Sequence, residues 1–103
     1  MPIVSTPGEV DICNAPLLGD ALVAATANAT RVIVDMTATS HCAASGFNVT
    51  IPTGEMLRSN GRELQLVCTT PVVLRLIDAL QARQVCRIFA SLSEALAAND
   101  GRA

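Results

Sequence analysis

The sequence of 103 residues predicts an α/β domain with a largely parallel sheet. Short β-branched runs, too short to be core helices, alternate with amphipathic segments of ordinary helix length. The connections between them are short, which favours one layered domain in which consecutive elements are neighbours. Hydrophobic residues make up 50% of the chain and aromatic residues 2%, so we expect a core of Val, Leu, Ile and Ala. We therefore expect a single domain over residues 1–103, with its core at about 3–98.

The first expected elements are a strand and a helix. Residues 3–4 favour a strand, but the Pro-Gly pair at 7–8 interrupts it, so the first strand is expected to be missing or shortened. Asn14 is the expected N-cap of the following helix. Pro16 is tolerated in the first turn of that helix, and residues 17–25 carry its apolar stripe.

The middle of the chain predicts a buried strand, a polar loop and a second helix. The β-branched run at 31–36 is the strand, and residues 37–44 are the loop. Ser45 stands where the N-cap of the second helix is expected, at the exposed end of the sheet. The Asn-Gly pair at 60–61 is the expected stop. Because Pro52 lacks an N–H and clashes with the preceding turn, at a cost of about 3 kcal/mol, we expect a kink or break just before it.

The last third of the chain continues the alternation. Residues 63–68 predict a strand, and Thr70 is the expected N-cap of a helix with proline at its first position. Residues 85–89 predict a short final strand. The capping box at 91–94 begins a last helix, and residues 99–103 are expected to fray.

Charge and composition exclude several classes of function. Seven Lys+Arg and nine Asp+Glu residues give a net charge of −2 without a basic patch, so no nucleic acid is expected as a partner. No apolar stretch reaches the roughly 20 residues of a membrane helix, and no secretion signal is evident, so we expect a cytoplasmic protein that does not contact a membrane. The four cysteines are widely scattered and only one histidine is present, which predicts reduced thiols, no metal site and no cofactor.

Two pairs of residues are candidates for catalysis, and neither predicts an enzyme. His41 and Cys42 resemble a base and its nucleophile, but adjacent side chains rarely point at each other. Asp11 and Asp35, taken as paired carboxylates, are an equally weak signal. An aspartate that closes a parallel strand often lies near a ligand site, and the alternative is that it bonds the adjacent loop. Cys42 is also a redox candidate, because a loop position near a helix N-terminus lowers a thiol pKa; the alternative is a loop cysteine with no role.

An ordered series of motifs covers nearly the whole chain. Its members are 8–11, the helix from Asn14, the strand segment 32–35, Ser45-Gly46, Gly61 before a strand, and the capped last helix. In order and spacing this series resembles the STAS domain of bacterial anti-sigma factor antagonists. The resemblance implies a mixed sheet with helices packed on one face.

The same resemblance implies a function in partner switching. Members of this family bind an anti-sigma factor, often a serine kinase of the histidine-kinase-like ATPase fold, and so free a sigma factor. The kinase phosphorylates a serine at the start of the helix after the third strand, which by position is Ser45 in this chain. The implied partner-binding residues are Cys42, Ala43, Ala44, Ser45, Gly46, Asn48 and Val49.

The chain departs from the family pattern, and alternatives remain open. Ala43 and Ala44 precede Ser45, where the family usually has Asp-Ser. The short first strand leaves a sheet edge that is either exposed or completed by a second copy, as a homodimer. Besides the antagonist interpretation, the chain fits a redox-responsive regulator acting through Cys42 or a non-phosphorylated STAS scaffold in a larger assembly. Ser45 itself fits either a phosphorylation site or a simple N-cap.

Overall fold

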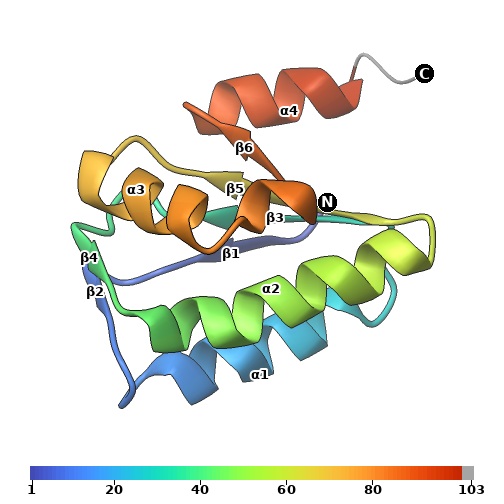
Figure 1. Ribbon diagram of the computed structural model, residues 1–103. Helices are drawn as coiled ribbons and strands as arrows, with labels where there is room; N and C mark the ends of the chain where they lie inside the picture. The colour runs from blue at the N-terminus through green and yellow to red at the C-terminus, as the bar shows by residue number, and fades with distance from the viewer. Residues whose placement is uncertain (101–103) are drawn as a thin grey trace.

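Four parallel strands form the main sheet of the computed structural model, which describes residues 1–100 (Figure 1). In sheet order the strands are β1 (Ile3–Ser5), β3 (Arg31–Asp35), β5 (Glu63–Val67) and β6 (Cys86–Phe89). Two short strands, β2 (Glu9–Val10) and β4 (His41–Cys42), form a separate parallel pair. The helices are α1 (Ala15–Thr26), α2 (Ala44–Ser59), α3 (Pro71–Ala79) and α4 (Leu92–Asp100), with a 3₁₀ turn, η1 (Ala82–Gln84). The predicted α/β architecture is therefore confirmed.

Every strand pair among the described residues is parallel. In the main sheet Ile3 lies opposite Ile33, and Arg31 lies opposite Glu63. Parallel neighbours need a crossover connection, and helices α1, α2 and α3 supply the three crossovers of this sheet. The carboxyl ends of all four strands consequently meet at one edge, where α2 and α3 begin.

Strand β1 is present but short, as expected. It has three residues, and the N–H groups of Ile33 and Thr6 continue its ladder by donating to the carbonyls of Pro2 and Asp35, each at 3.0 Å. The Pro-Gly pair then turns the chain away from the sheet. β1 is an edge strand, and the side chain of Ile3 is 43% exposed.

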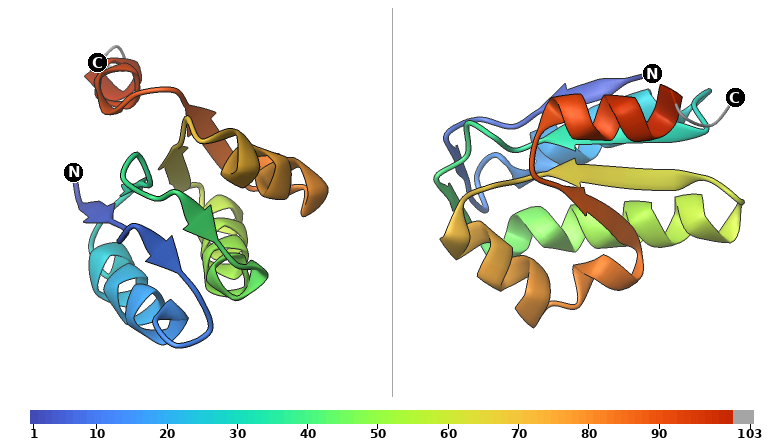
Figure 2. Two further views of the ribbon diagram at one scale, coloured as in Figure 1. Left: turned by 90° about the vertical axis from the view of Figure 1, so that its left-hand side faces the viewer. Right: turned by 90° about the horizontal axis from the view of Figure 1, so that it is seen from above.

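The helices cover both faces of the sheet, whereas one face was expected. Alternate residues of β3 and β5 point to opposite sides, so Val32 and Leu64 pack with the side chains of α1, α2 and α3, while Ile33 and Val67 face the other way. Helix α4 covers this second pair through Ala95. Figures 1 and 2 show α4 across the sheet from α1 and α2. The second face therefore has a small apolar core of its own.

Helix α2 continues through Pro52 without the expected break. Phe47 and Leu57, on the two sides of the proline, are buried in the main core and hold both halves of the helix against the sheet. Gly54 lets the helix approach β6 closely, because a Cβ there would lie 2.8 Å from the carbonyl oxygen of Val85. Tertiary packing thus outweighs a local cost of about 3 kcal/mol.

The predicted helix ends are largely confirmed. Asn60 is the C-cap of α2 and Gly61 has φ +71°, and the N–H of Arg62 donates to the carbonyl of Leu57 at 2.7 Å, a Schellman arrangement. In the capping box of α4, the Oγ of Ser91 accepts from the N–H of Glu94 at 3.1 Å. The Glu94 carboxylate accepts from the N–H of Ala90 rather than that of Ser91.

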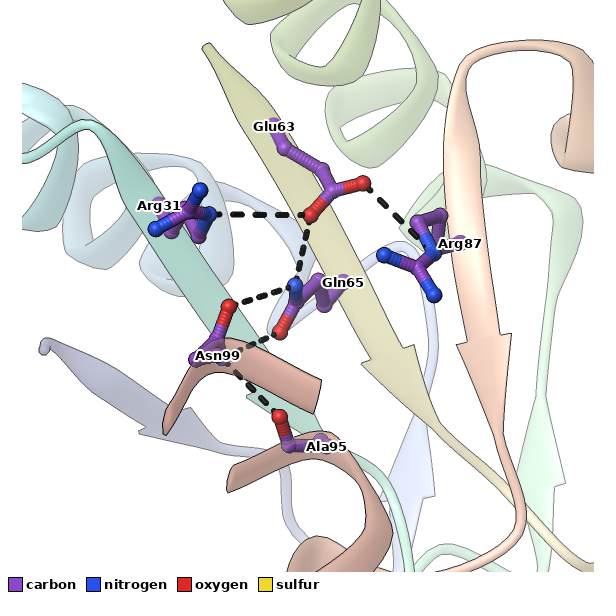
Figure 3. A network of polar contacts seen from close by, with 6 residues as sticks. All are labelled: Arg31, Glu63, Gln65, Arg87, Ala95 and Asn99. Carbon is purple, nitrogen blue, oxygen red and sulfur yellow. Dashed lines mark hydrogen bonds and ion pairs between the residues drawn. The ribbon is translucent and has the colours of Figure 1, made fainter. Parts of the chain in front are cut away.

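The end of α4 is ordered at Asn99, where fraying was expected. The side-chain amide of Asn99 exchanges two hydrogen bonds, at 2.9 and 3.0 Å, with the amide of the fully buried Gln65 in β5 (Figure 3). This reciprocal pair satisfies a polar group that would otherwise be buried without partners. Residues 101–103, also expected to fray, lie outside the described residues.

Candidate functional site

The N-terminal end of α2 is anchored by a strand pair that the sequence did not predict. Cys42 lies in β4, not in a loop, and pairs with Val10 of β2. The N–H of Ala43 donates to the carbonyl of Val10 at 2.8 Å and extends this pairing to the residue before the helix. The segment that begins α2 is consequently fixed on both sides, by β4 before it and by the core behind it.

Gly46 brings the start of α2 into direct contact with this strand pair. A Cβ at this position would lie 2.7 Å from Cγ1 of Val10 and 2.9 Å from Sγ of Cys42. Real Cβ atoms do not approach other atoms this closely, so only glycine fits without a shift of the neighbours. The Ser-Gly sequence that carried the resemblance therefore has a packing reason at its second residue.

Ser45 is not the N-cap of α2. Ala43 occupies that position, with extended backbone (φ −75°, ψ 161°), and Ser45 is the second residue of the helix. Its Oγ is buried and has no hydrogen-bond partner within residues 1–100. A buried hydroxyl without a partner costs about 1–3 kcal/mol. Ser45 therefore brings no capping bond to the helix, and its hydroxyl is hidden in this conformation.

The expected partner-binding residues differ in exposure. Ala44 and Asn48 are exposed, and Ser45 is half-buried like its neighbours Ala43 and Val49. Cys42 and Gly46 are buried and can act only by supporting the others. The fully exposed part of the expected surface thus consists of two small side chains, one apolar (Ala44) and one polar (Asn48).

Three threonines hold together the loops at the carboxyl edge of the sheet. The hydroxyls of Thr6 and Thr39 hydrogen bond to each other at 2.5 Å, and that of Thr39 also donates to the carbonyl of Pro7 at 2.6 Å. The hydroxyl of Thr70 donates to the carbonyl of Thr39 at 2.9 Å. This threonine network joins the loops after β1, β3 and β5, and it fixes the loop that leads into β4. The sequence marked Thr70 only as an N-cap and gave no local signal for Thr6 or Thr39, because the three residues lie in different loops.

Asp11 and Asp35 order their own loops. One carboxylate oxygen of Asp11 accepts from the N–H groups of Cys13 and Asn14, at 2.9 and 3.1 Å. One carboxylate oxygen of Asp35 accepts from the N–H and hydroxyl of Thr37, at 3.0 and 2.7 Å. These are Asx-type turn contacts, in agreement with the alternative that such an aspartate bonds its adjacent loop.

His41 and Cys42 do not form a base and nucleophile pair. As consecutive residues of β4 they point to opposite sides, so His41 is exposed and Cys42 is buried. Burial, with a smaller contribution from the neighbouring Cys68, raises the pKa of the Cys42 thiol to about 11. The expectation of an exposed thiol with a lowered pKa is therefore wrong for Cys42. The exposed cysteine is Cys13, in the loop before α1.

Cys68 and Cys86 behave as small buried hydrophobic residues. Burial raises the pKa of Cys86 to about 12 and also raises that of Cys68. Within residues 1–100 no three side chains of His, Cys, Asp or Glu gather as a metal site would need. In the same residues no helix combines the length and apolar character needed to cross a membrane.

Comparisons with known proteins agree with this geometry. The chain is similar to the crystal structure of an anti-sigma factor antagonist from Mycobacterium paratuberculosis, at 26% identity and a TM-score of 0.84, over 93% of this chain and 82% of that one. A putative anti-sigma factor antagonist from Thermotoga maritima is 17% identical, with a TM-score of 0.78, over 91% of this chain and 84% of that one. The unphosphorylated form of the anti-sigma factor antagonist SpoIIAA is 13% identical, with a TM-score of 0.74, over 98% of this chain and 89% of that one. A search of curated proteins found no match.

The family assignment rests on the sequence as well as the fold. The family model described as the STAS domain matches residues 1–95, from before β1 to the middle of α4. The three solved structures compared above are described as anti-sigma factor antagonists, one of them as a putative one. The chain therefore belongs to the STAS domain family.

Proposed function

We propose that this protein is an anti-sigma factor antagonist, which binds an anti-sigma factor in the cytoplasm and so releases a sigma factor. In this proposal the protein is a regulator and not an enzyme. Its similarity to the antagonist from Mycobacterium paratuberculosis, which extends over 93% of the chain, is the observation that carries the proposal. The expected partner is an anti-sigma factor of the histidine-kinase-like ATPase fold.

The proposed docking surface is the N-terminal end of α2. Ala44 and Asn48 are exposed there, and the neighbouring Ala43 and Gly46 add almost no side-chain bulk. A partner backbone can therefore approach the first turn closely. The β2–β4 pair and the threonine network hold this turn in place, so little conformational entropy is lost on binding.

Ser45 is the proposed switch within this surface. Buried polar atoms nearly always have partners, so an unpaired hydroxyl at this position calls for a reason, and a role in modification supplies one. Phosphorylation adds a charge of about −1.5 to −2, which the first turn of a helix tolerates. A kinase reaches the hydroxyl once the side chain rotates outward. In the complex the charge would lie uncompensated at an interface, which costs several kcal/mol.

The test compares two serines at the same helical position. Each ATPase-fold anti-sigma factor from the genome of origin is titrated onto the wild-type domain and its Ser45→Asp and Ser93→Asp variants. Ser93 is the exposed second residue of α4, so it is a matched control on the other face of the sheet. We expect one anti-sigma factor to bind the wild type and Ser93→Asp equally. We expect binding to Ser45→Asp to be weaker by roughly 100-fold, about 2.7 kcal/mol.

A second measurement separates binding from phosphorylation. The complex is incubated with ATP, and the phosphorylated residue is identified by mass spectrometry. Phosphate on Ser45 supports the switch, and phosphate elsewhere or none contradicts it. If no anti-sigma factor binds the wild type, the antagonist proposal fails.

The exposed edge of β1 favours one alternative, a non-phosphorylated scaffold that associates with itself. Ile3 on this edge is 43% exposed, and Met1 beside it is 53% exposed. Light scattering tests this alternative, because a scaffold that pairs through β1 is a homodimer and Ile3→Lys makes it monomeric. A wild-type monomer excludes it.

A further inference from the structure

A hollow lined with arginines lies at the opposite end of α2. Its volume is about 250 Å³, and the side chains of Arg58, Arg62, Arg83 and Arg87 line it. They come from the last turn of α2, the approach to β5, the η1 turn and β6. All seven basic residues of the sequence are arginines, so this hollow gathers more than half of them.

The hollow is strongly cationic in a chain of net charge −2. The carboxylate of Glu63, the only acidic group that lines it among the described residues, is shared by the Nε atoms of Arg87 at 3.6 Å and Arg31 at 4.0 Å (Figure 3). The same carboxylate accepts from the amide of Gln65 at 2.6 Å. Adding the pair formed by Arg83 and Asp78, at 2.6 Å, gives five arginines against two carboxylates, a local charge of +3.

Two of the guanidinium groups are held by uncharged partners. Arg58 donates through Nη1 to the carbonyl of Gln84. Arg62 donates through Nη1 to the carbonyls of Thr26 and Ala29, at 2.9 and 3.1 Å. A carbonyl fixes the position of a guanidinium without cancelling its charge, and each such contact uses few of its five N–H donors.

Packing also fixes the two walls of the hollow relative to each other. Gly54 of α2 lies so close to β6 that a Cβ would be 2.8 Å from the carbonyl oxygen of Val85 and 2.9 Å from Sγ of Cys86. On the β6 wall, the guanidinium carbon of Arg87 lies 5.0 Å from the centre of the Phe89 ring. Arg87 thus contacts Phe89 on the face of the sheet that α4 covers, whereas Arg58 comes from α2 on the other face, so the hollow is lined by arginines from both faces.

We propose that this hollow is a binding site for a diphosphate group. Guanidinium groups bind phosphate oxygens through paired, charge-assisted hydrogen bonds, and several arginines at one point match a ligand of several negative charges. The hollow is smaller than the roughly 300–1,000 Å³ of sites that enclose a whole drug-sized molecule, so it fits the phosphates and not a bulky organic part. The site is at the far end of α2 from Ser45, a helix of 16 residues or about 24 Å, and does not depend on the proposed function.

The test titrates the domain with pyrophosphate and, separately, with ADP, by calorimetry at near-physiological salt. We expect saturable binding of pyrophosphate with one site and a dissociation constant below about 1 mM. If the source of the diphosphate is a nucleotide, ADP binds more tightly than pyrophosphate; equal or weaker binding of ADP indicates the free anion. Both results support a diphosphate site.

Matched arginine variants locate the site. Arg58→Gln and Arg83→Gln are expected to weaken pyrophosphate binding at least tenfold, about 1.4 kcal/mol each. Arg75→Gln removes the same charge from an exposed residue of α3 that does not line the hollow, and it is expected to leave binding unchanged. An equal loss in all three variants overturns the proposal, because it indicates diffuse attraction by net charge. Absence of saturable binding to the wild type also overturns it.

A measurement on the wild type alone guards against a variant that fails to fold. In amide NMR spectra, pyrophosphate is expected to shift the backbone signals of residues 84–87 and the Nε–H signals of the lining arginines. The signals of β2 and β4 are expected to stay in place. Shifts confined to other parts of the chain contradict the assignment of the ligand to this hollow.

Discussion

Replacing Ser45 with alanine is expected to stabilise the protein, which is the opposite of what an N-cap would do. The buried, unpaired Oγ costs about 1–3 kcal/mol in lost hydration, and alanine removes that cost. Alanine is also the better helix former at the second position of α2, by about 0.5 kcal/mol. The lost oxygen leaves a small void worth about 1 kcal/mol in the other direction. The expected net gain in the free energy of unfolding is about 0.5–2.5 kcal/mol.

Urea denaturation followed by circular dichroism measures this gain. The midpoint should rise with an unchanged m-value, because the surface exposed on unfolding is nearly the same. Ser91→Ala is the opposite control, since Ser91 does accept a capping bond, and it should lose about 1 kcal/mol. Ser93→Ala, at the exposed second position of α4, should change little.

A loss of stability in Ser45→Ala comparable to that in Ser91→Ala would refute this reasoning. It would mean that the hydroxyl of Ser45 makes a favourable hydrogen bond in solution, as the sequence interpretation of an N-cap required. Ser45 would then need no functional explanation for its presence.

Three further results are expected. Gly46→Ala should lose about 1–3 kcal/mol in urea denaturation through overpacking, while Gly8→Ala, whose Cβ would meet only one atom, at 3.9 Å, should be nearly neutral. A thiol reagent should label the exposed Cys13 rapidly and the three buried cysteines slowly. The Cys13→Ser variant is the control, because it should lose the fast phase of labelling. Fast labelling of Cys42 would instead support the redox alternative. Because the folded pKa of Cys42 is raised, its stabilising contribution is complete below about pH 9 and is lost as pH rises through about 11. Alkaline urea titrations should therefore show a shallower decline in Cys42→Ala than in the wild type; identical declines would contradict burial of this thiol.

Local signals in the sequence predicted most of the elements and their ends. The stop at Asn60-Gly61 and the capping bond of Ser91 were found as expected. Asn14 and Thr70 occupy the expected N-cap positions, although neither side chain makes a capping hydrogen bond. The short length of β1 was likewise visible in the Pro-Gly pair that follows it. Such features are determined by backbone conformation and by hydrogen bonds within a few residues.

The features that were missed depend on contacts between distant segments. Strand β4 exists only because it pairs with β2, more than thirty residues earlier in the chain, and this pairing buries Cys42 and moves the helix start to Ala44. Pro52 stays inside α2 because the core holds the helix on both sides of it. The apolar residues of α4 alone did not predict which face of the sheet this helix covers. The face is determined by Ile33 and Val67 of the sheet, against which Ala95 packs.

The small second core has a consequence for local unfolding. Its apolar cluster, in the part of the chain that the structure describes, has Ile33, Val67 and Ala95 fully buried, supported by the partly buried Phe89 and Leu92. The main core joins three helices to the sheet. Opening of α4 alone breaks few apolar contacts and leaves the crossovers between the strands intact. Amide protons of α4 should therefore exchange through sub-global openings of lower free energy than those of β3 and β5. In such an opened state the protein presents the apolar second face of its sheet to solvent while the rest of the fold persists.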